Sequence, residues 1–401
     1  MEVNGMKILV PDKVDPIIVQ LMTDLSYEVS YKPGLEPVET AGIAGEYDAV
    51  IVRSYALHDI PIEGRIKAIG RAGAGVNNIP VERCAEKGVV VFNAPGANAN
   101  AVKELVICGL ILSSRGISEG IQWVKTIKRD VAKTVEKKKG SFKGSEIIGK
   151  KLAVIGLGAI GCQIANSAYD LGMEVVGYDP FITVDNALRL SRSVRRVEEL
   201  KSLLLDADYL TVHIPISDET RAMIDQAVFS IMKPGVKLLN FSRAEIVDRE
   251  ALLKALDSGV VDKYVTDFPD EELIEHNKVI TIPHLGASTK EAEENCAKMI
   301  AAQVDDFLKT GNISNSVNYP EVHLDRFGGT RIGIFNRNVP GIVSKISEIL
   351  SADKLNIAGM INKSKGDFAY NIFDIDGGVQ ETVIGEIRAI DGVIRVRKIE
   401  N

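Results

Sequence analysis

The chain has 401 residues, of which 45% are hydrophobic and 26% charged, and its formal net charge is −7. This length and composition predict a globular protein of two or three domains, and the acidic balance excludes a general attraction to nucleic acid or anionic membranes. No signal peptide precedes Lys7 and no apolar run reaches transmembrane length, so we expect a cytoplasmic protein without membrane or nucleic-acid partners.

The first 93 residues alternate short β-rich runs with helical patterns, which predicts a parallel, doubly wound sheet. The expected strands are 7–10, 27–31, 49–53, 66–69 and 89–92. The turn at 70–78 follows a strand and offers backbone amides to an anion. It lacks the following acid that a complete nucleotide fingerprint requires.

A long apolar helix is expected over 98–114, followed by a Lys-rich stretch from Lys125 to Lys151. We interpret this stretch as a solvated, charged loop at the first crossing between domains. The alternative is that its lysines attract the phosphate of a ligand.

Residues 152–161 form an apolar run and a glycine turn that opens a helix. Gly156 permits the tight turn, Gly158 lets the backbone approach a pyrophosphate, and Gly161 allows close packing of helix and strand. Asp179 ends the next expected strand, where a carboxylate binds the adenosine ribose hydroxyls and disfavours a 2′-phosphate. This spacing predicts NAD. The alternatives are an ordinary β-α-β unit, and NADP bound through the cluster of Arg189, Arg192, Arg195 and Arg196.

The same β-α rhythm continues to residue 284, with expected strands at 209–214, 237–241, 264–267 and 279–282. Ligands of such sheets bind beyond the carboxyl ends of the strands. Arg243, the acidic run after Asp267, and His284 all follow strand ends. A helix over 290–308 is then long enough to return to the first domain.

These residue types indicate hydride transfer at a carbon next to a carboxylate. His284 is suited to carry the proton, because imidazole titrates near neutrality, and a neighbouring carboxylate would favour its charged form. Arg243 can bind a carboxylate through its planar fork. The four cysteines have no metal or disulfide spacing, so no metal site is expected and we predict buried thiols at Cys84, Cys108, Cys162 and Cys296.

After a polar linker over 312–325 the pattern changes to β-α-β-β-α-β, which predicts a ferredoxin-like module over residues 326–401. Its expected elements are strands at 331–335, 356–362, 368–374 and 393–399, with helices at 341–350 and 379–390. We interpret the module as a separate third domain.

The glycine fingerprint, Asp179, Ser242-Arg243 and the run 283–289 together resemble the D-isomer-specific 2-hydroxyacid dehydrogenases over residues 1–310. The resemblance implies two Rossmann or flavodoxin-like domains, one binding substrate (1–97 and 286–315) and one binding NAD (98–285). It also implies that catalysis falls to Arg243, a glutamate and His284, and that NAD contacts Gly156, Gly158, Ala159, Ile160, Gly161, Asp179, Ile214, Phe241, Ser242, Asp267, Gly286 and Ala287. Substrate binding is assigned to Arg53, Ser54, Arg71, Ala74 and Gly75.

The catalytic glutamate is ambiguous because the family usually has Asp-Val-Phe, whereas here Asp267 directly precedes Phe268. A deleted valine selects Glu271, which we prefer; counting from Asp267 selects Glu272. Two further departures from the family are Asn77, where Asp is usual, and Leu57, where Lys is common.

Within the family the chain is most similar to the branch that oxidises 3-phospho-D-glycerate, and the C-terminal module resembles an amino-acid-sensing ACT domain. The expected activity is therefore oxidation of that acid with NAD, the first step of L-serine biosynthesis, in a homodimer or homotetramer. Asn336, Asn338 and Asn356 match effector positions for L-serine, although they also suit turns. The alternatives are another substrate, such as 2-hydroxyglutarate, glycerate or lactate, and a non-catalytic, NAD-sensing corepressor.

Overall fold

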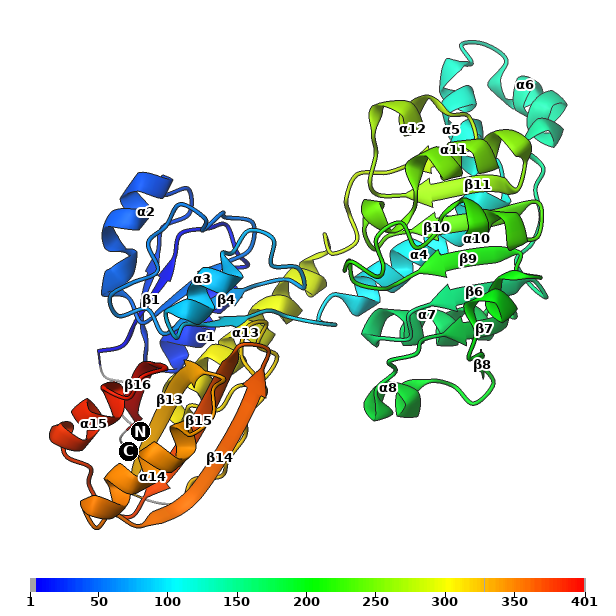
Figure 1. Ribbon diagram of the computed structural model, residues 1–401. Helices are drawn as coiled ribbons and strands as arrows, with labels where there is room; N and C mark the ends of the chain where they lie inside the picture. The colour runs from blue at the N-terminus through cyan, green and yellow to red at the C-terminus, as the bar shows by residue number, and fades with distance from the viewer. Residues whose placement is uncertain (1–4, 328, 400–401) are drawn as a thin grey trace. The chain divides into compact units, whose positions relative to one another are not determined.

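The structure is a computed structural model and describes residues 5–327 and 329–399 (Figure 1). Contacts divide the chain into two units. The first combines Met1–Asn98 with Glu293–Asn401, and the second is Ala99–Ala292. Each unit is built on sheets covered by helices.

The first unit begins with a five-stranded parallel sheet in the order β2-β1-β3-β4-β5. Its strands consist largely of buried aliphatic residues, as expected for a sheet covered on both faces. The elements are β1 Lys7–Val10, α1 Ile17–Asp24, β2 Glu28–Tyr31, α2 Pro37–Ile43, β3 Ala49–Val52, β4 Ala68–Arg71, α3 Val81–Glu86 and β5 Val90–Phe92. This confirms the predicted doubly wound sheet, with strand ends shifted by one or two residues.

The second unit contains a seven-stranded parallel sheet in the order β12-β11-β10-β9-β6-β7-β8. The strand order reverses between β6 and β9, which is the position where such sheets bind ligands. The strands are β6 Lys151–Ile155, β7 Glu174–Tyr178, β8 Arg195–Arg196, β9 Tyr209–Val212, β10 Val236–Asn240, β11 Val261–Thr266 and β12 Val279–Thr281. The helices are α4 Ala99–Ser114, α7 Ala159–Asp170, α8 Val184–Arg189, α9 Leu200–Leu204, α10 Gln226–Ile231, α11 Arg249–Ser258 and α12 Glu271–Glu275.

The Lys-rich stretch is not the loop that the sequence predicts. It contains α6 Val131–Lys138 and the short helix Lys139–Phe142, and α5 Ile117–Thr126 ends within it. No residue of α5 or α6 is buried. Ile117, Ile121 and Val124 of α5 recur at helical spacing, but Ile121 and Val124 are exposed. Cys108 is a second correction, because it is exposed, whereas the other three cysteines are buried.

The C-terminal module lies in the first unit and has the predicted β-α-β-β-α-β order. Its antiparallel sheet has the strand order β14-β15-β13-β16. The elements are β13 Thr330–Arg337, α14 Ile342–Ala352, β14 Ile357–Lys365, β15 Phe368–Ile375, α15 Glu381–Arg388 and β16 Val393–Ile399. Residues of α14 and α15 form a core with one face of this sheet.

The other face of the module's sheet packs against the first parallel sheet and α13 Lys290–Thr310. Phe335, Tyr370 and Ile372 belong to the same buried cluster as Ile8, and as Phe307 of α13. The module and the five-stranded sheet therefore share one hydrophobic core.

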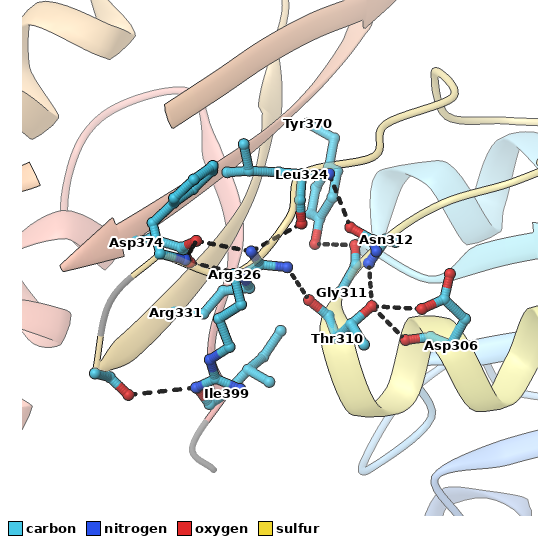
Figure 2. A network of polar contacts seen from close by, with 12 residues as sticks. Asp306, Thr310, Gly311, Asn312, Leu324, Arg326, Arg331, Tyr370, Asp374 and Ile399 are labelled. Atoms are coloured by element: carbon cyan, nitrogen blue, oxygen red, sulfur yellow. Dashed lines mark hydrogen bonds and ion pairs between the residues drawn. The ribbon is translucent and has the colours of Figure 1, made fainter. Parts of the chain in front are cut away.

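A buried ion pair reinforces this contact. Arg331 Nε and Asp374 Oδ1 are 2.6 Å apart, and the two side chains are almost inaccessible to solvent. Arg331 also donates to the carbonyls of Thr310 and Leu324, both at 2.9 Å (Figure 2). Four of the five N–H donors of the guanidinium thus meet an acceptor, and such hydrogen bonding is what allows a buried charge to be tolerated.

The segment 312–325 is not the independent polar linker that the sequence predicts. Ile313, Tyr319 and Val322 are fully buried, and Ile313 pairs with Val322 in an antiparallel bridge. Tyr319 donates to the carbonyl of Ala85 at 2.6 Å. Its buried apolar residues were overlooked because they are interspersed with Asn and Ser. Within the described residues, no helix combines the length and apolar character needed to cross a membrane.

Candidate functional site

The candidate site lies along one edge of the seven-stranded sheet. Because the strands are parallel, their carboxyl ends meet at the same edge. The predicted residues that follow these strand ends are Gly156 after β6, Asp179 after β7, Ile214 after β9, Phe241 to Arg243 after β10, Asp267 after β11 and His284 after β12.

In the glycine turn between β6 and α7, two positions require glycine because a Cβ there would overlap a backbone carbonyl oxygen. Gly156 has φ +90°, and a Cβ there would lie 2.4 Å from the carbonyl oxygen of His213. A Cβ on Gly161 would lie 1.8 Å from the carbonyl oxygen of Gly156. A Cβ on Gly158, by contrast, would meet nothing within 4 Å. Gly158 therefore faces open space directly before the first turn of α7, which contains Ala159 and Ile160.

Asp179 is held beside this turn by backbone amides. Its Oδ2 accepts from the amide of Leu157 and its Oδ1 from the amide of Phe181, both at 2.8 Å. A carboxylate has about four acceptor positions, so both oxygens retain capacity for further donors.

The loop carrying Arg243 is fixed by a buried amide. Asn240, the last residue of β10, donates to the carbonyl of Arg243 at 2.8 Å and accepts from the amide of Ser242 at 3.1 Å. The hydroxyl of Ser242 donates to the carbonyl of Ile214 at 2.5 Å, which joins this loop to the end of β9. The sequence interpretation gave Asn240 no role; the signal was a polar residue ending an otherwise apolar strand.

Asp267 is the most unusual residue of the edge. It is 1% exposed, and neither carboxylate oxygen has a hydrogen-bonding partner of good geometry among the described residues. Burial raises the pKa of this carboxyl group. The charges of His284 and Arg243, together with the nearby amide of Gly286, oppose the increase. The predicted catalytic side chains His284 and Arg243 are therefore close enough to act electrostatically on one buried carboxylate.

His284 and the acidic run occupy the neighbouring strand ends. The imidazole packs edge-on against Phe268, with ring centroids 4.9 Å apart. Glu272 is engaged elsewhere, because its carboxylate pairs with Arg249 at 2.9 Å. Glu271 is exposed at the start of α12, without a hydrogen bond or ion pair in the described part of the chain. Across the same residues, no hydrogen bond joins His284 to either glutamate.

The residues assigned to substrate binding lie in the first unit, in two segments that we call the anion loops, residues 53–55 and 71–75. Asp12 Oδ2 accepts the amides of Arg53, Ser54 and Tyr55 at 2.8, 2.5 and 2.8 Å. Burial raises the pKa of Asp12, but these amides outweigh it and the net shift is downward. A charged carboxylate therefore fixes the backbone of the first loop.

The second anion loop begins at the last residue of β4 and is hydrogen-bonded to the first loop. Arg71 Nε donates to the carbonyl of Arg53 at 3.0 Å, and a Cβ on Gly73 would lie 2.1 Å from Arg71 Nη1. Asn93 donates to the carbonyl of Ala74, next to Gly75, at 2.5 Å. A side chain at position 73 would therefore force the end of the Arg71 side chain to move.

The three asparagines assigned to an effector do not converge within one chain. Asn336 is buried and accepts from Asn371 at 2.6 Å, and Asn338 donates to the carbonyl of Gly366 at 3.1 Å. Asn356 instead donates to Asp376 at 2.6 Å. In the strand register, Asn336 lies opposite Ala369, whereas Asn356 precedes Ile357, which lies opposite Ile375. The first two therefore lie at one end of the module's sheet and Asn356 lies at the other.

Comparison with known proteins shows which family this chain belongs to. Residues 108–286 match the family model for the D-isomer specific 2-hydroxyacid dehydrogenase NAD binding domain. A D-3-phosphoglycerate dehydrogenase of Escherichia coli is 34% identical over 346 residues, which cover 83% of this chain and 81% of that protein. The chain belongs to the D-isomer specific 2-hydroxyacid dehydrogenase family.

Two further members of the family extend the comparison. The D-3-phosphoglycerate dehydrogenase of Sus scrofa is 34% identical over 79% of this chain, which spans only 59% of that protein's length. The structure of an NAD+-bound 3-phosphoglycerate dehydrogenase from Entamoeba histolytica superposes with a TM-score of 0.63 and 27% identity, covering 78% of this chain and 98% of that one. The predicted fold class and family are thereby confirmed.

Proposed function

We propose that the protein oxidises 3-phospho-D-glycerate to 3-phosphooxypyruvate with NAD, the first step of L-serine biosynthesis. The observation that supports the proposal is the buried carboxylate of Asp267. Among the described residues its oxygens have no hydrogen-bond partner of good geometry, and both His284 and Arg243 interact with it electrostatically. A buried acceptor without a donor is costly unless a ligand supplies one. The D-3-phosphoglycerate dehydrogenases among its relatives support this choice of substrate.

The residues at the sheet edge fit NAD. The open space at Gly158 admits a pyrophosphate against the amides that begin α7, and Asp179 retains acceptor capacity for ribose hydroxyls. The unpartnered oxygens of Asp267 suit the amide donors of a nicotinamide carboxamide. When bound, NAD accepts the hydride from the carbon that carries the substrate hydroxyl.

The protein's own part in the reaction is binding and proton transfer. Arg243 binds the substrate carboxylate through its fork and remains charged throughout. His284 removes the hydroxyl proton at an imidazole nitrogen, and Glu271 is the carboxylate available to orient the ring, because Glu272 is paired with Arg249. Arg53, Ser54, Arg71, Ala74 and Gly75 of the anion loops bind the remaining anionic group.

The test is a turnover assay of the purified chain with 3-phosphoglycerate, glycerate, lactate and 2-hydroxyglutarate, each with NAD and NADP. We expect the highest kcat/KM with 3-phosphoglycerate and NAD, and a loss of at least roughly 10²-fold in His284→Ala. A higher kcat/KM for another acid reassigns the substrate. Binding of NAD without any turnover supports the NAD-sensing alternative.

We also propose that the C-terminal module is an ACT domain that binds L-serine through Asn336, Asn338 and Asn356 in a homodimer or homotetramer. A second copy of the module is the natural source of the missing side chain, since the three residues lie at opposite ends of one sheet. Serine titration of the activity, with sedimentation of the protein at the same concentrations, tests both serine binding and the oligomeric state.

The proposed location is the cytoplasm. All four cysteines are free, which supports a reducing compartment.

A further inference from the structure

Arg53, in the first anion loop, already has an anionic partner within the chain. Its Nη1 lies 2.6 Å from Oε1 of Glu293, near the start of α13, and the two side chains are 26% and 33% exposed. At this distance the contact is a close ion pair between partly exposed groups. The pair could not be predicted from the sequence, because the two residues are far apart in the chain.

The pairing is not needed to shape the loop. Asp12 fixes the backbone of residues 53–55 through three amides, and the carbonyl of Arg53 accepts from Arg71. What Glu293 holds is the guanidinium itself. Its effect is therefore on the charge and direction of Arg53.

Arg71 lies in the same electrostatic neighbourhood. The pKa of the Cys296 thiol, one turn of α13 beyond Glu293, is raised mainly by burial; both Arg53 and Arg71 lower it, and Glu293 raises it. The two arginines and Glu293 thus surround one end of α13 with a combined formal charge of +1. Without Glu293 that charge would be +2.

We propose that Glu293 is a specificity-determining residue for the anionic group of the substrate. This inference rests on the proposed function of the anion loops. In the structure Glu293 is paired with Arg53, and an anion that binds Arg53 must share or replace that contact. Glu293 repels the anion in proportion to the ligand's charge. Small free dianions, which make few other contacts, are therefore held weakly, whereas a substrate that also binds elsewhere is retained.

The experiment uses the full chain with Glu293→Gln, which keeps an acceptor oxygen for Arg53 but removes the negative charge. The matched control is Glu294→Gln, on the same helix, whose carboxylate pairs with Lys298 at 2.6 Å. Calorimetric Kd values are measured for inorganic sulfate, D-glycerate and 3-phosphoglycerate, together with Tm and KM.

We expect Glu293→Gln to tighten binding of the monoanion D-glycerate by roughly three-fold and of the dianion sulfate by roughly ten-fold, the scale of a partly exposed ion pair. 3-Phosphoglycerate gains at least as much as sulfate, in both Kd and KM. Glu294→Gln leaves all three affinities unchanged.

A purely structural role for Glu293 predicts the opposite result, namely equal weakening of all ligands with a lower Tm, and that result overturns the inference. An equal gain for every ligand, or the same gain in Glu294→Gln, also overturns it. If the wild-type chain turns over none of the acids but sulfate still binds more tightly to Glu293→Gln, the proposed function fails and the assignment of Glu293 stands.

Discussion

At the scale of single residues, Asp267 combines two properties that rarely occur together away from a binding site: it is nearly inaccessible, and its carboxylate has no well-formed hydrogen bond within the described part of the chain. Burial raises its pKa, and His284, the nearby amide of Gly286 and Arg243 oppose the increase. A neutral donor that arrives with a ligand relieves this arrangement.

Asp267→Asn is expected to weaken NAD binding by roughly ten-fold, because one strong acceptor is replaced by a group that is itself half donor. Fluorescence or calorimetric titration with NAD measures the effect. Asp262→Asn is the control, since Asp262 lies on β11, the strand that precedes Asp267, but is exposed and pairs with Lys237 at 3.1 Å. Equal affinities in the wild type and Asp267→Asn would remove Asp267 from the cofactor site.

A second buried carboxylate has a structural role. Asp48 accepts from Lys67 and Arg65, both at 2.8 Å, and from the amide of Lys7 at 2.9 Å. Burial raises its pKa, but the Lys67 bond, the Lys7 amide and the Arg65 charge more than compensate, so the net shift is downward. Asp48 therefore stabilises the fold at pH values above its unfolded pKa of about 4, and this contribution is lost as the pH falls through the lower native pKa.

Asp48→Asn should lower the free energy of unfolding by about 2 kcal/mol at neutral pH, a value below that of a fully buried pair because both cations are partly exposed. Urea unfolding at several pH values is the measurement. The difference from the wild type should narrow between about pH 5 and pH 3. A difference that stays constant over that range contradicts the assigned pKa shift.

At the scale of elements, the sequence predicted those whose pattern is set by burial. The strands of both parallel sheets except β8, and the order of the C-terminal module, were predicted correctly, because nearly all of these elements bury an apolar face. The two-residue strand β8 was missed, since Arg195 and Arg196 are both exposed. The helices α5 and α6 were missed, since neither buries a residue in this chain. The Arg53–Glu293 pair and the buried segment 312–325 could not be foreseen either, because both depend on contacts between distant parts of the sequence.

The glycine turn before α7 separates a structural glycine from a ligand-facing one. Gly161→Ala should reduce the free energy of unfolding by at least about 2 kcal/mol, since its Cβ would overlap a backbone carbonyl that cannot move freely. Gly158→Ala should leave Tm nearly unchanged, because its Cβ meets no atom within 4 Å, yet it should weaken NAD binding. Thermal unfolding and NAD titration of both variants test the distinction, which is lost if the two variants behave alike.

At the scale of the whole molecule, the C-terminal module is packed against the five-stranded sheet of the first unit more extensively than a separately folded, appended domain would be. Two arginines of β16 add hydrogen bonds to this contact. Arg397 donates to the carbonyl of Leu308 at 3.1 Å, and Arg395 donates to the carbonyl of Ile66. With Phe335 and Tyr370 in the shared core, removing the module would expose a large apolar surface. We therefore expect a chain truncated after residue 325 to be recovered mainly as aggregate.

The ion pair of Arg331 with Asp374 allows a single substitution to test whether the module and the five-stranded sheet unfold together. Arg331→Ala removes the charged partner of the buried Asp374 carboxylate, which keeps only the amide of Phe327, and it removes the donors to the carbonyls of Thr310 and Leu324. It should therefore cost about 3–5 kcal/mol of the free energy of unfolding. Glu294→Gln breaks a partly exposed pair and should cost less than about 1 kcal/mol. If the module and the five-stranded sheet unfold as one body, Arg331→Ala should move a single urea transition, read equally by fluorescence and by circular dichroism. Two separated transitions in that variant would show that the module folds independently of the sheet on which it packs.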